Sequence, residues 1–128
     1  MDGNLEIVVG SNDSDVYAWH NDGKLVSGFP VVTGGSVESS PALGDIDGDG
    51  FDDVAIGALF ADPNADKSGA SYILFGKANG FAASINPAAL IGTNGFELAG
   101  IALNDRSGRP VSGAGDVNGD GFDDVVVG

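Results

Sequence analysis

The sequence predicts an all-β fold built from repeated units of short antiparallel strands, and three observations support this prediction. Glycine is frequent, at 22 of 128 residues, and glycine-rich turns alternate with short runs of Val, Ile, Phe and Tyr. No segment shows convincing helical periodicity, and Asn86–Gly92 is too short for more than one helical turn. The third observation is a repeat, because GDIDGDGFDDVAIG at residues 44–57 returns as GDVNGDGFDDVVVG at residues 115–128.

A weaker copy of the repeat, Asp2–Gly10, opens the chain, and the segments between the copies follow one order. An apolar strand follows each acidic stretch, an aromatic strand comes next, and a strand of small residues leads into the next acidic stretch. The expected strands, in that order, are Leu5–Val9, Val16–His20 and Ser39–Ile46, and then Val54–Ile56, Ser71–Gly76 and Pro110–Val117. Four short strands per unit with turns between them are typical of a β-propeller blade.

The chain is expected to be one propeller segment, 1–128, with repeat units at approximately 2–48 and 49–119 and a partial unit at 120–128. If the four strands of a blade are lettered A to D, the chain runs B-C-D, A-B-C-D, A-B, or about two blades. A closed propeller has about 4–8 blades, and an open stack exposes apolar faces and strand edges. We therefore expect a homo-oligomer, most simply a ring of two to four chains that share strands.

The charge balance excludes one class of partner. The chain has 19 acidic and 5 basic residues and a formal net charge of −14. Without a basic patch, nucleic acid is not an expected partner.

No apolar run approaches the ~20 residues of a membrane span. The absence of cysteine excludes disulfide and thiolate chemistry, and the N-terminal MDGNLEIVVG lacks signal-peptide features, so a secreted protein would be represented here by a mature or excerpted chain.

Two acidic loops, residues 45–53 (the first loop) and 116–124 (the second loop), carry oxygen ligands at a spacing that suits Ca²⁺. Side chains at positions 1, 3 and 5 of a tight loop converge on one point, a glycine at position 6 permits the turn, and a carbonyl at position 7 adds an oxygen. An acid at position 9 completes the set. The predicted ligands are Asp45, Asp47, Asp49, the Phe51 carbonyl and Asp53, and then Asp116, Asn118, Asp120, the Phe122 carbonyl and Asp124. We expect two Ca²⁺ ions per chain.

Other loop types match less well. EF-hand and dockerin-type loops require an acid at position 12, where this chain has Ile56 and Val127. Solvated Asp-Gly hairpin turns would account for the glycines but not for the density of acids.

Some acids near the loops are not predicted to be ligands. Asp52 and Asp123 occupy position 8, and their side chains are expected to point away from positions 7 and 9 and to be solvated or hydrogen-bonded in a turn. A supporting contact beside the ligands is the alternative for these two acids. The N-terminal copy retains only Asp2 and Glu6 of the pattern, so a site there would need oxygens from another chain.

The stretches GDIDGDGFDDVAIGA and SGAGDVNGDGFDDVVVG resemble the FG-GAP repeats of integrin-α-type β-propellers, in which the cation loop joins strands A and B of a blade. Residues 71–124 resemble the bacterial version, which occurs in large secreted or surface proteins. The resemblance implies a non-catalytic module for adhesion or protein–protein contact, located outside the cell or on its surface. It places cation ligands at Asp45, Asp47, Asp49 and Asp53, and at Asp116, Asn118, Asp120 and Asp124.

Three alternatives remain open at this stage. A propeller lectin would use the same blades, with Trp19 as a candidate for stacking on a sugar. An enzyme with a site at the ring centre is disfavoured, because His20 is the only histidine, no cysteine is present and no G-x-S-x-G motif occurs. The chain could also be an engineered or excerpted propeller fragment with only a structural role.

Overall fold

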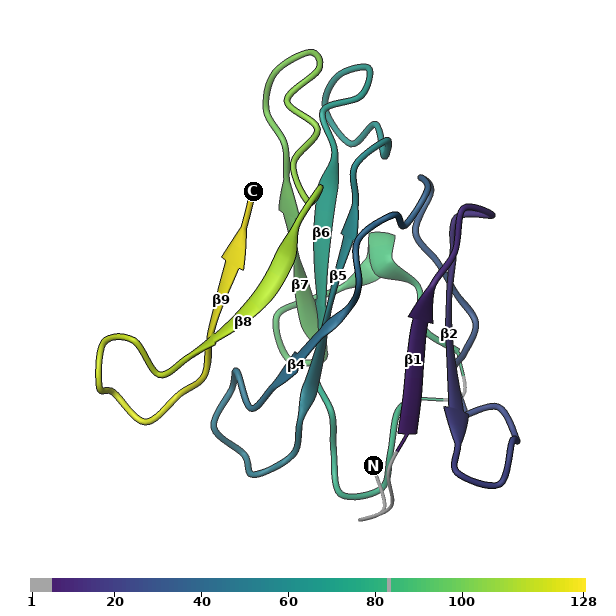
Figure 1. Ribbon diagram of the computed structural model, residues 1–128, viewed down its shortest axis with the longest axis vertical. Coiled ribbons are helices and arrows are strands. Elements are labelled where there is room, and N and C mark those ends of the chain that lie inside the picture. The colour runs from purple at the N-terminus through teal and green to yellow at the C-terminus, as the bar shows by residue number, and fades with distance from the viewer. Residues whose placement is uncertain (1–5, 83) are drawn as a thin grey trace.

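The computed structural model describes residues 6–82 and 84–128, which form nine strands and one turn of 3-10 helix (Figure 1). The strands are β1 (Glu6–Gly10), β2 (Asp15–His20), β3 (Val31–Val32), β4 (Ala42–Gly44), β5 (Asp53–Ala58), β6 (Ala70–Leu74), β7 (Gly95–Ala99), β8 (Val111–Gly115) and β9 (Asp124–Val127), and the 3-10 turn η1 is Pro87–Ala89. No helix in this described part is long and apolar enough to cross a membrane.

The strands pair into three sheets, in the orders β1-β2-β3, β4-β5-β6-β7 and β8-β9. Every neighbouring pair is antiparallel. The predicted all-β, antiparallel fold is therefore confirmed. In Figure 1 the three sheets stand side by side, with the four-stranded sheet between the other two.

Two strands were not located from the sequence, and several predicted strands are shorter in the structure, most of all the strand that leads into the first loop. The two-residue β3 and the five-residue β7 each complete a sheet as its last strand, but neither lies in a repeated sequence pattern. The predicted strand Ser39–Ile46 is reduced to β4, Ala42–Gly44. The reason is local, because the Ile46 N–H donates to the Asp53 carboxylate and so already belongs to the first loop. Leu5, the first residue of another predicted strand, lies outside the described residues.

The core lies between the first sheet and the four-stranded sheet. Alternate residues of β2 are buried, as expected for a strand with one covered face, whereas every residue of β5 and β6 is buried. The Tyr72 hydroxyl crosses the interface and donates to the Thr33 carbonyl at 3.1 Å. The buried core residues are Val16, Ala18, Val26, Phe29, Val31, Val37, Val54, Ile56, Ala58, Ala61, Ala70, Tyr72 and Leu74.

On the other face of the four-stranded sheet, the backbone of the sheet directly contacts the backbone of the segment that leads into β8. A Cβ atom on Gly57 would lie 1.9 Å from the Gly108 carbonyl oxygen, and one on Gly69 would lie 2.2 Å from the Ser107 carbonyl oxygen. The Ser107 N–H donates to the Ser68 carbonyl at 3.0 Å, which fixes this contact. Only glycine permits so close an approach of two backbones. This contact places β8 and β9 against the sheet and brings the second loop toward the first.

Substituting Gly57 with alanine should lower the free energy of unfolding by about 1–3 kcal/mol, because the added methyl group overlaps the Gly108 backbone. Gly113→Ala is the matched control, since its Cβ would meet its nearest neighbour, the Leu43 carbonyl oxygen, at 3.4 Å. Denaturant unfolding of both variants measures the difference. Equal stability of the two variants would show that the Gly57–Gly108 contact does not hold the sheets together.

Candidate metal centre

The first loop connects β4 to β5 and is folded by its own aspartate side chains. The two carboxylate oxygens of Asp45 accept hydrogen bonds from the Gly48 N–H at 2.8 Å and the Gly50 N–H at 3.0 Å. Both glycines have positive φ values, 78° and 90°. This conformation suits glycine and turns the backbone N–H groups toward the Asp45 carboxylate. The first predicted ligand is thus oriented by the loop itself.

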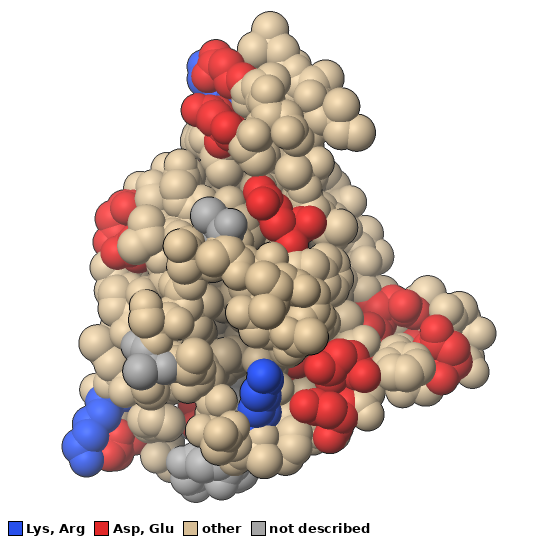
Figure 2. All heavy atoms as spheres, turned by 180° about the vertical axis from the view of Figure 1, so that it is seen from behind, with Lys and Arg blue, Asp and Glu red and all other residues tan. Residues whose placement is uncertain are grey.

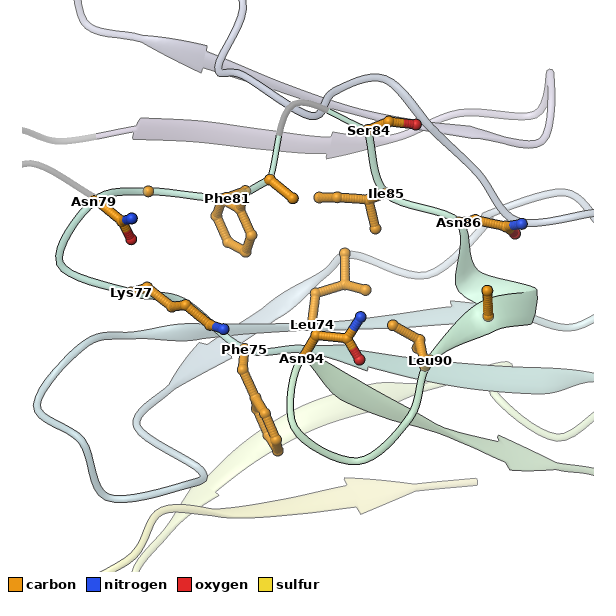
Figure 3. Close-up of a pocket in the computed structure, with 13 residues that line it drawn as sticks. Leu74, Phe75, Lys77, Asn79, Phe81, Ser84, Ile85, Asn86, Leu90 and Asn94 are labelled. Carbon is orange, nitrogen blue, oxygen red and sulfur yellow. The ribbon is translucent and has the colours of Figure 1, made fainter.

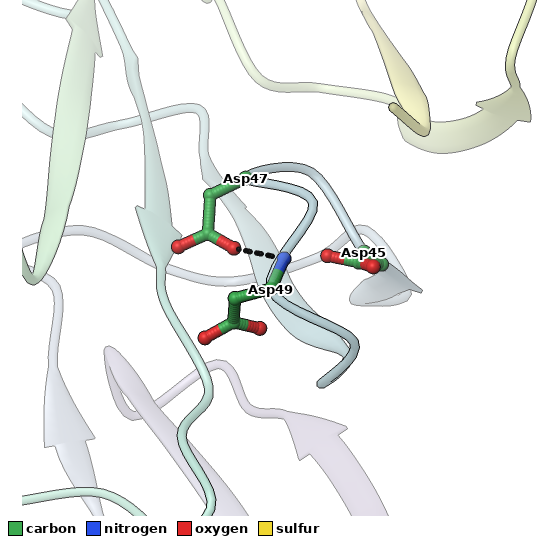
Figure 4. A group of neighbouring side chains, drawn as sticks. All are labelled: Asp45, Asp47 and Asp49. Atoms are coloured by element: carbon green, nitrogen blue, oxygen red, sulfur yellow. Dashed lines mark hydrogen bonds between the residues drawn. The ribbon is translucent and has the colours of Figure 1, made fainter. Parts of the chain in front are cut away.

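The next two aspartates are held in the same way. Asp47 accepts the Asp49 N–H at 3.1 Å, and Asp49 accepts the Phe51 N–H at 2.9 Å. As a result, Asp45, Asp47 and Asp49 each place a carboxylate oxygen within 4.8 Å of the others (Figure 4). Asp45 is half-buried, and the other two side chains are exposed. Three carboxylates at this separation offer the hard oxygen ligands that a divalent cation prefers.

Asp53 lies at the start of β5 and is fully buried. Its carboxylate accepts the Ile46 N–H at 2.7 Å, the Asp47 N–H at 3.2 Å and the Gly76 N–H at 2.8 Å. Burial raises the pKa of the Asp53 carboxyl above its ordinary value, against the hydrogen bonds from these N–H groups. The structure places this predicted ligand against the beginning of the first loop, outside the group of three carboxylates. Asp53 therefore joins the loop to the buried sheet.

The second loop connects β8 to β9 and repeats the hydrogen-bonding scheme. Asp116 accepts the Gly119 N–H at 2.7 Å and the Gly121 N–H at 2.8 Å. The hydrogen bond from Gly121 is the main reason that the pKa of Asp116 lies below its ordinary value. Asp120 accepts the Phe122 N–H at 3.0 Å, and Asp124 accepts the Val117 N–H at 2.8 Å. The two loops are thus alike in structure as well as in sequence.

The loops differ at position 3. Asn118 stands where the first loop has Asp47, and its amide donates to Asp120 Oδ2 at 2.9 Å. Among the described residues, a group of three clustered metal-ligating side chains of the Asp, Glu, His or Cys type occurs only in the first loop. The second loop offers two carboxylates and one amide at positions 1, 3 and 5. Its predicted ligand set is therefore less negative than that of the first loop.

Acidic side chains gather where the two loops lie, at the lower right of Figure 2. The ion pairs of the described residues, Glu6–His20 at 3.2 Å and Lys24–Asp22 at 2.9 Å, both lie outside the loops. The first of these pairs involves Glu6, the acid at position 9 of the N-terminal copy. Asp2 lies outside the described residues. The loop carboxylates repel one another, and a bound cation would relieve that repulsion.

The expectation that the Asp123 side chain is solvated or hydrogen-bonded within a turn is wrong. Its carboxylate accepts the Asp45 N–H at 3.0 Å, so it contacts the first residue of the first loop across 78 positions of sequence. Asp52, at the same position of the first loop, is exposed and makes no side-chain hydrogen bond to another described residue. A repeat can show that two loops share a pattern, but it does not show that one loop contacts the other.

A hollow of about 400 Å³ lies away from the loops, between the end of β6 and the segment 77–94 (Figure 3). Leu74, Phe81, Ile85 and Leu90 supply its apolar lining. Phe81 also packs edge-on against Phe29 of the core, with ring centroids 5.3 Å apart. Among the described lining residues, Lys77 is the only ionisable one. The described residues of this lining therefore supply no carboxylate or imidazole for acid–base chemistry or metal binding.

Replacing Asp53 with alanine should lower the free energy of unfolding by about 2–4 kcal/mol, because several N–H groups lose their acceptor where water is excluded. Asp124→Ala, the same position in the second loop, should cost only about 1 kcal/mol, since Asp124 is half-buried and accepts the N–H of Val117. Unfolding should be measured with a chelator present. Losses of equal size would contradict a distinct structural role for Asp53.

Two protein families match segments of this chain. The FG-GAP repeat family matches residues 39–74, and the FG-GAP-like repeat family matches residues 1–56. The first loop lies inside both matched segments. These matches confirm the resemblance identified from the sequence.

A curated relative agrees with them. Integrin alpha-4 of Xenopus laevis is 33% identical over 103 residues, which make up 80% of this chain and 9% of the integrin. The chain thus spans a small part of that relative's length. The structure agrees with these matches. Its antiparallel sheets have up to four strands, and an acidic loop connects β4 to β5 and another connects β8 to β9. The chain therefore contains FG-GAP repeats of the kind found in integrin-α-type β-propellers.

Proposed function

We propose that the chain is a calcium-binding, non-catalytic propeller module for adhesion or protein–protein interaction. The observation that carries this proposal is the convergence of Asp45, Asp47 and Asp49 to within 4.8 Å of one another. FG-GAP repeats indicate an adhesion or interaction module, and the integrin relative favours an extracellular or cell-surface location. The proposal gives the cation a structural role, which is to stabilise the loops that join the first two strands of a blade.

The donor set suits calcium. In the first loop, the proposed ligands are the three clustered carboxylates, the Phe51 carbonyl and Asp53, and in the second loop they are Asp116, Asn118, Asp120, the Phe122 carbonyl and Asp124. All of these donors are oxygens, and Ca²⁺ takes six to eight oxygen ligands in a flexible geometry. A bound calcium ion would supply the positive charge that the clustered carboxylates lack. We propose one ion in each loop.

A sugar-binding role remains an alternative prediction. Trp19 stacks on Tyr17, with ring centroids 5.5 Å apart and an angle of 8° between the planes. One face of the indole is thus covered by a neighbouring ring of the same strand, which favours packing over sugar binding. Binding of the calcium-loaded protein to a glycan array would favour the lectin alternative.

Calcium should raise the melting temperature of the protein, because only the folded loops bring the ligands together. Asp49→Ala and Asp120→Ala should each abolish binding at one loop and leave the other loop able to bind. Asp52→Ala, which removes an exposed acid from the first loop outside the ligand set, is the control and should retain both sites. Calorimetry counts the ions bound, and thermal melting with calcium or chelator measures the stabilisation. Unmodified protein that binds no calcium would overturn the proposal.

We also propose that copies of the chain associate through the outer face of the first sheet. On this face Ile7 and Val9 of β1 are 59% and 42% exposed, and they pair across the sheet with Trp19 and Tyr17. A large apolar face on a folded protein commonly marks an interaction surface. A homo-oligomer that completes a propeller ring would cover it.

Light scattering of the calcium-loaded protein at micromolar concentration should give the mass of two to four chains. Ile7→Lys should shift this mass toward one chain, because it places a charge in the proposed interface. Ile101→Lys is the control, since Ile101 is 83% exposed and lies outside the first sheet. A stable, calcium-loaded monomer would contradict the association.

A further inference from the structure

Asp123 joins the two acidic loops through a reciprocal pair of hydrogen bonds. The Asp45 N–H donates to Asp123 Oδ2 at 3.0 Å, and the Asp123 N–H donates to the Asp45 carbonyl at 2.9 Å. The Asp123 carboxylate also packs against Gly44, where an added Cβ would lie 3.0 Å from Oδ2. One residue of the second loop therefore holds both backbone polar groups of a residue in the first.

This pair determines the position of a proposed ligand. The carboxylate of Asp45 is held by the Gly48 and Gly50 N–H groups of its own loop, and its backbone is held by Asp123. All polar groups of Asp45 are thus engaged, and half of them are engaged by the other loop. If Asp123 moves, the first carboxylate of the first loop moves with it.

A second contact reinforces the first. The Phe122 ring lies directly on Gly48, where an added Cβ would lie 2.3 Å from Cε1 of the ring. Strands β4 and β8, which lead into the two loops, also lie side by side. Residues 122 and 123 therefore pack on the first loop as a continuous edge of the second.

The same edge belongs to the ligand-bearing part of the second loop. The Phe122 N–H donates to Asp120, and the Phe122 carbonyl is itself a proposed ligand. Asp124, the next proposed ligand, follows Asp123 directly and accepts the Val117 N–H. Any change that orders the second loop around a cation must therefore also order the edge that holds Asp45.

We infer that Asp123 is a positioning residue that couples the two cation loops, so that calcium binding at the second loop raises the affinity of the first. This inference rests on the proposed calcium function and extends it. Because coupling between two sites is reciprocal, calcium at the first loop raises the affinity of the second by the same factor. Position 8, which carries no ligand, thus links the cation site of one blade to that of the next.

The test is a titration of the full chain with CaCl2, followed by NMR. The amide signal of Gly50 reports on the first loop, and that of Gly121 reports on the second, so each affinity is measured separately. Asp123→Ala should weaken calcium binding at the first loop roughly five- to tenfold, because it removes the acceptor for the Asp45 N–H. Asp123→Asn retains an acceptor oxygen and should restore most of that affinity. Asp52→Ala is the matched control, since it removes the same charge from position 8 of the first loop, where the exposed side chain accepts no hydrogen bond from another described residue.

A second arm does not depend on Asp123. Asp120→Ala, which disables the second loop, should lower the calcium affinity of the first loop, as reported by the Gly50 amide signal, about fivefold. This factor is at the low end of typical coupling between two sites. The inference is overturned if Asp123→Ala and Asp52→Ala give equal affinities at the first loop, or if Asp120→Ala leaves the Gly50 titration unchanged. An unmodified protein with no calcium-dependent shift of either glycine would overturn the proposed function itself, which is a different outcome.

Discussion

The fold around both loops depends on aspartate carboxylates that accept backbone N–H groups of their own loop. These hydrogen bonds close the turn and aim the side chains, and they hold Asp45, Asp47 and Asp49 close together although like charges repel. The buried carboxylate of Asp53 then fastens the loop to β5 and to Gly76 beyond β6. The bonds that connect the loop to the sheet and close its turn therefore also hold the three carboxylates together.

The stacking of the sheets follows from two kinds of contact. Large apolar side chains fill the space between the first sheet and the four-stranded sheet, so those sheets are held by burial of apolar surface. On the opposite face, Gly57 and Gly69 allow the backbone at Ser107 and Gly108 to approach directly. This close approach brings β8 alongside β4, which is what places Asp123 within reach of Asp45. The contact between the two loops therefore depends on how closely the four-stranded sheet and the β8-β9 sheet approach each other.

The sequence predicted the features that depend on local chemistry. The repeated spacing of Asp and Gly predicted the two turns, and the loop side chains do fold onto their own N–H groups. It did not predict β3 or β7, because these short strands carry no repeated pattern and form only against neighbouring strands. It also misplaced Asp123, because its partner lies 78 residues away and becomes a neighbour only when the sheets stack. Features set by neighbouring residues could thus be predicted from the sequence, whereas contacts between repeat units became visible only in the folded structure.

The proposed function requires a calcium ion in each loop. The most direct measurement is anomalous diffraction from crystals of this chain grown with calcium, which locates the ion independently of stability or affinity. We expect one anomalous peak enclosed by Asp45, Asp47 and Asp49 in the first loop, and a second enclosed by Asp116, Asn118 and Asp120 in the second loop. Ordered loops without an anomalous peak in either one, at a calcium concentration far above that of extracellular fluid, would contradict the proposed function.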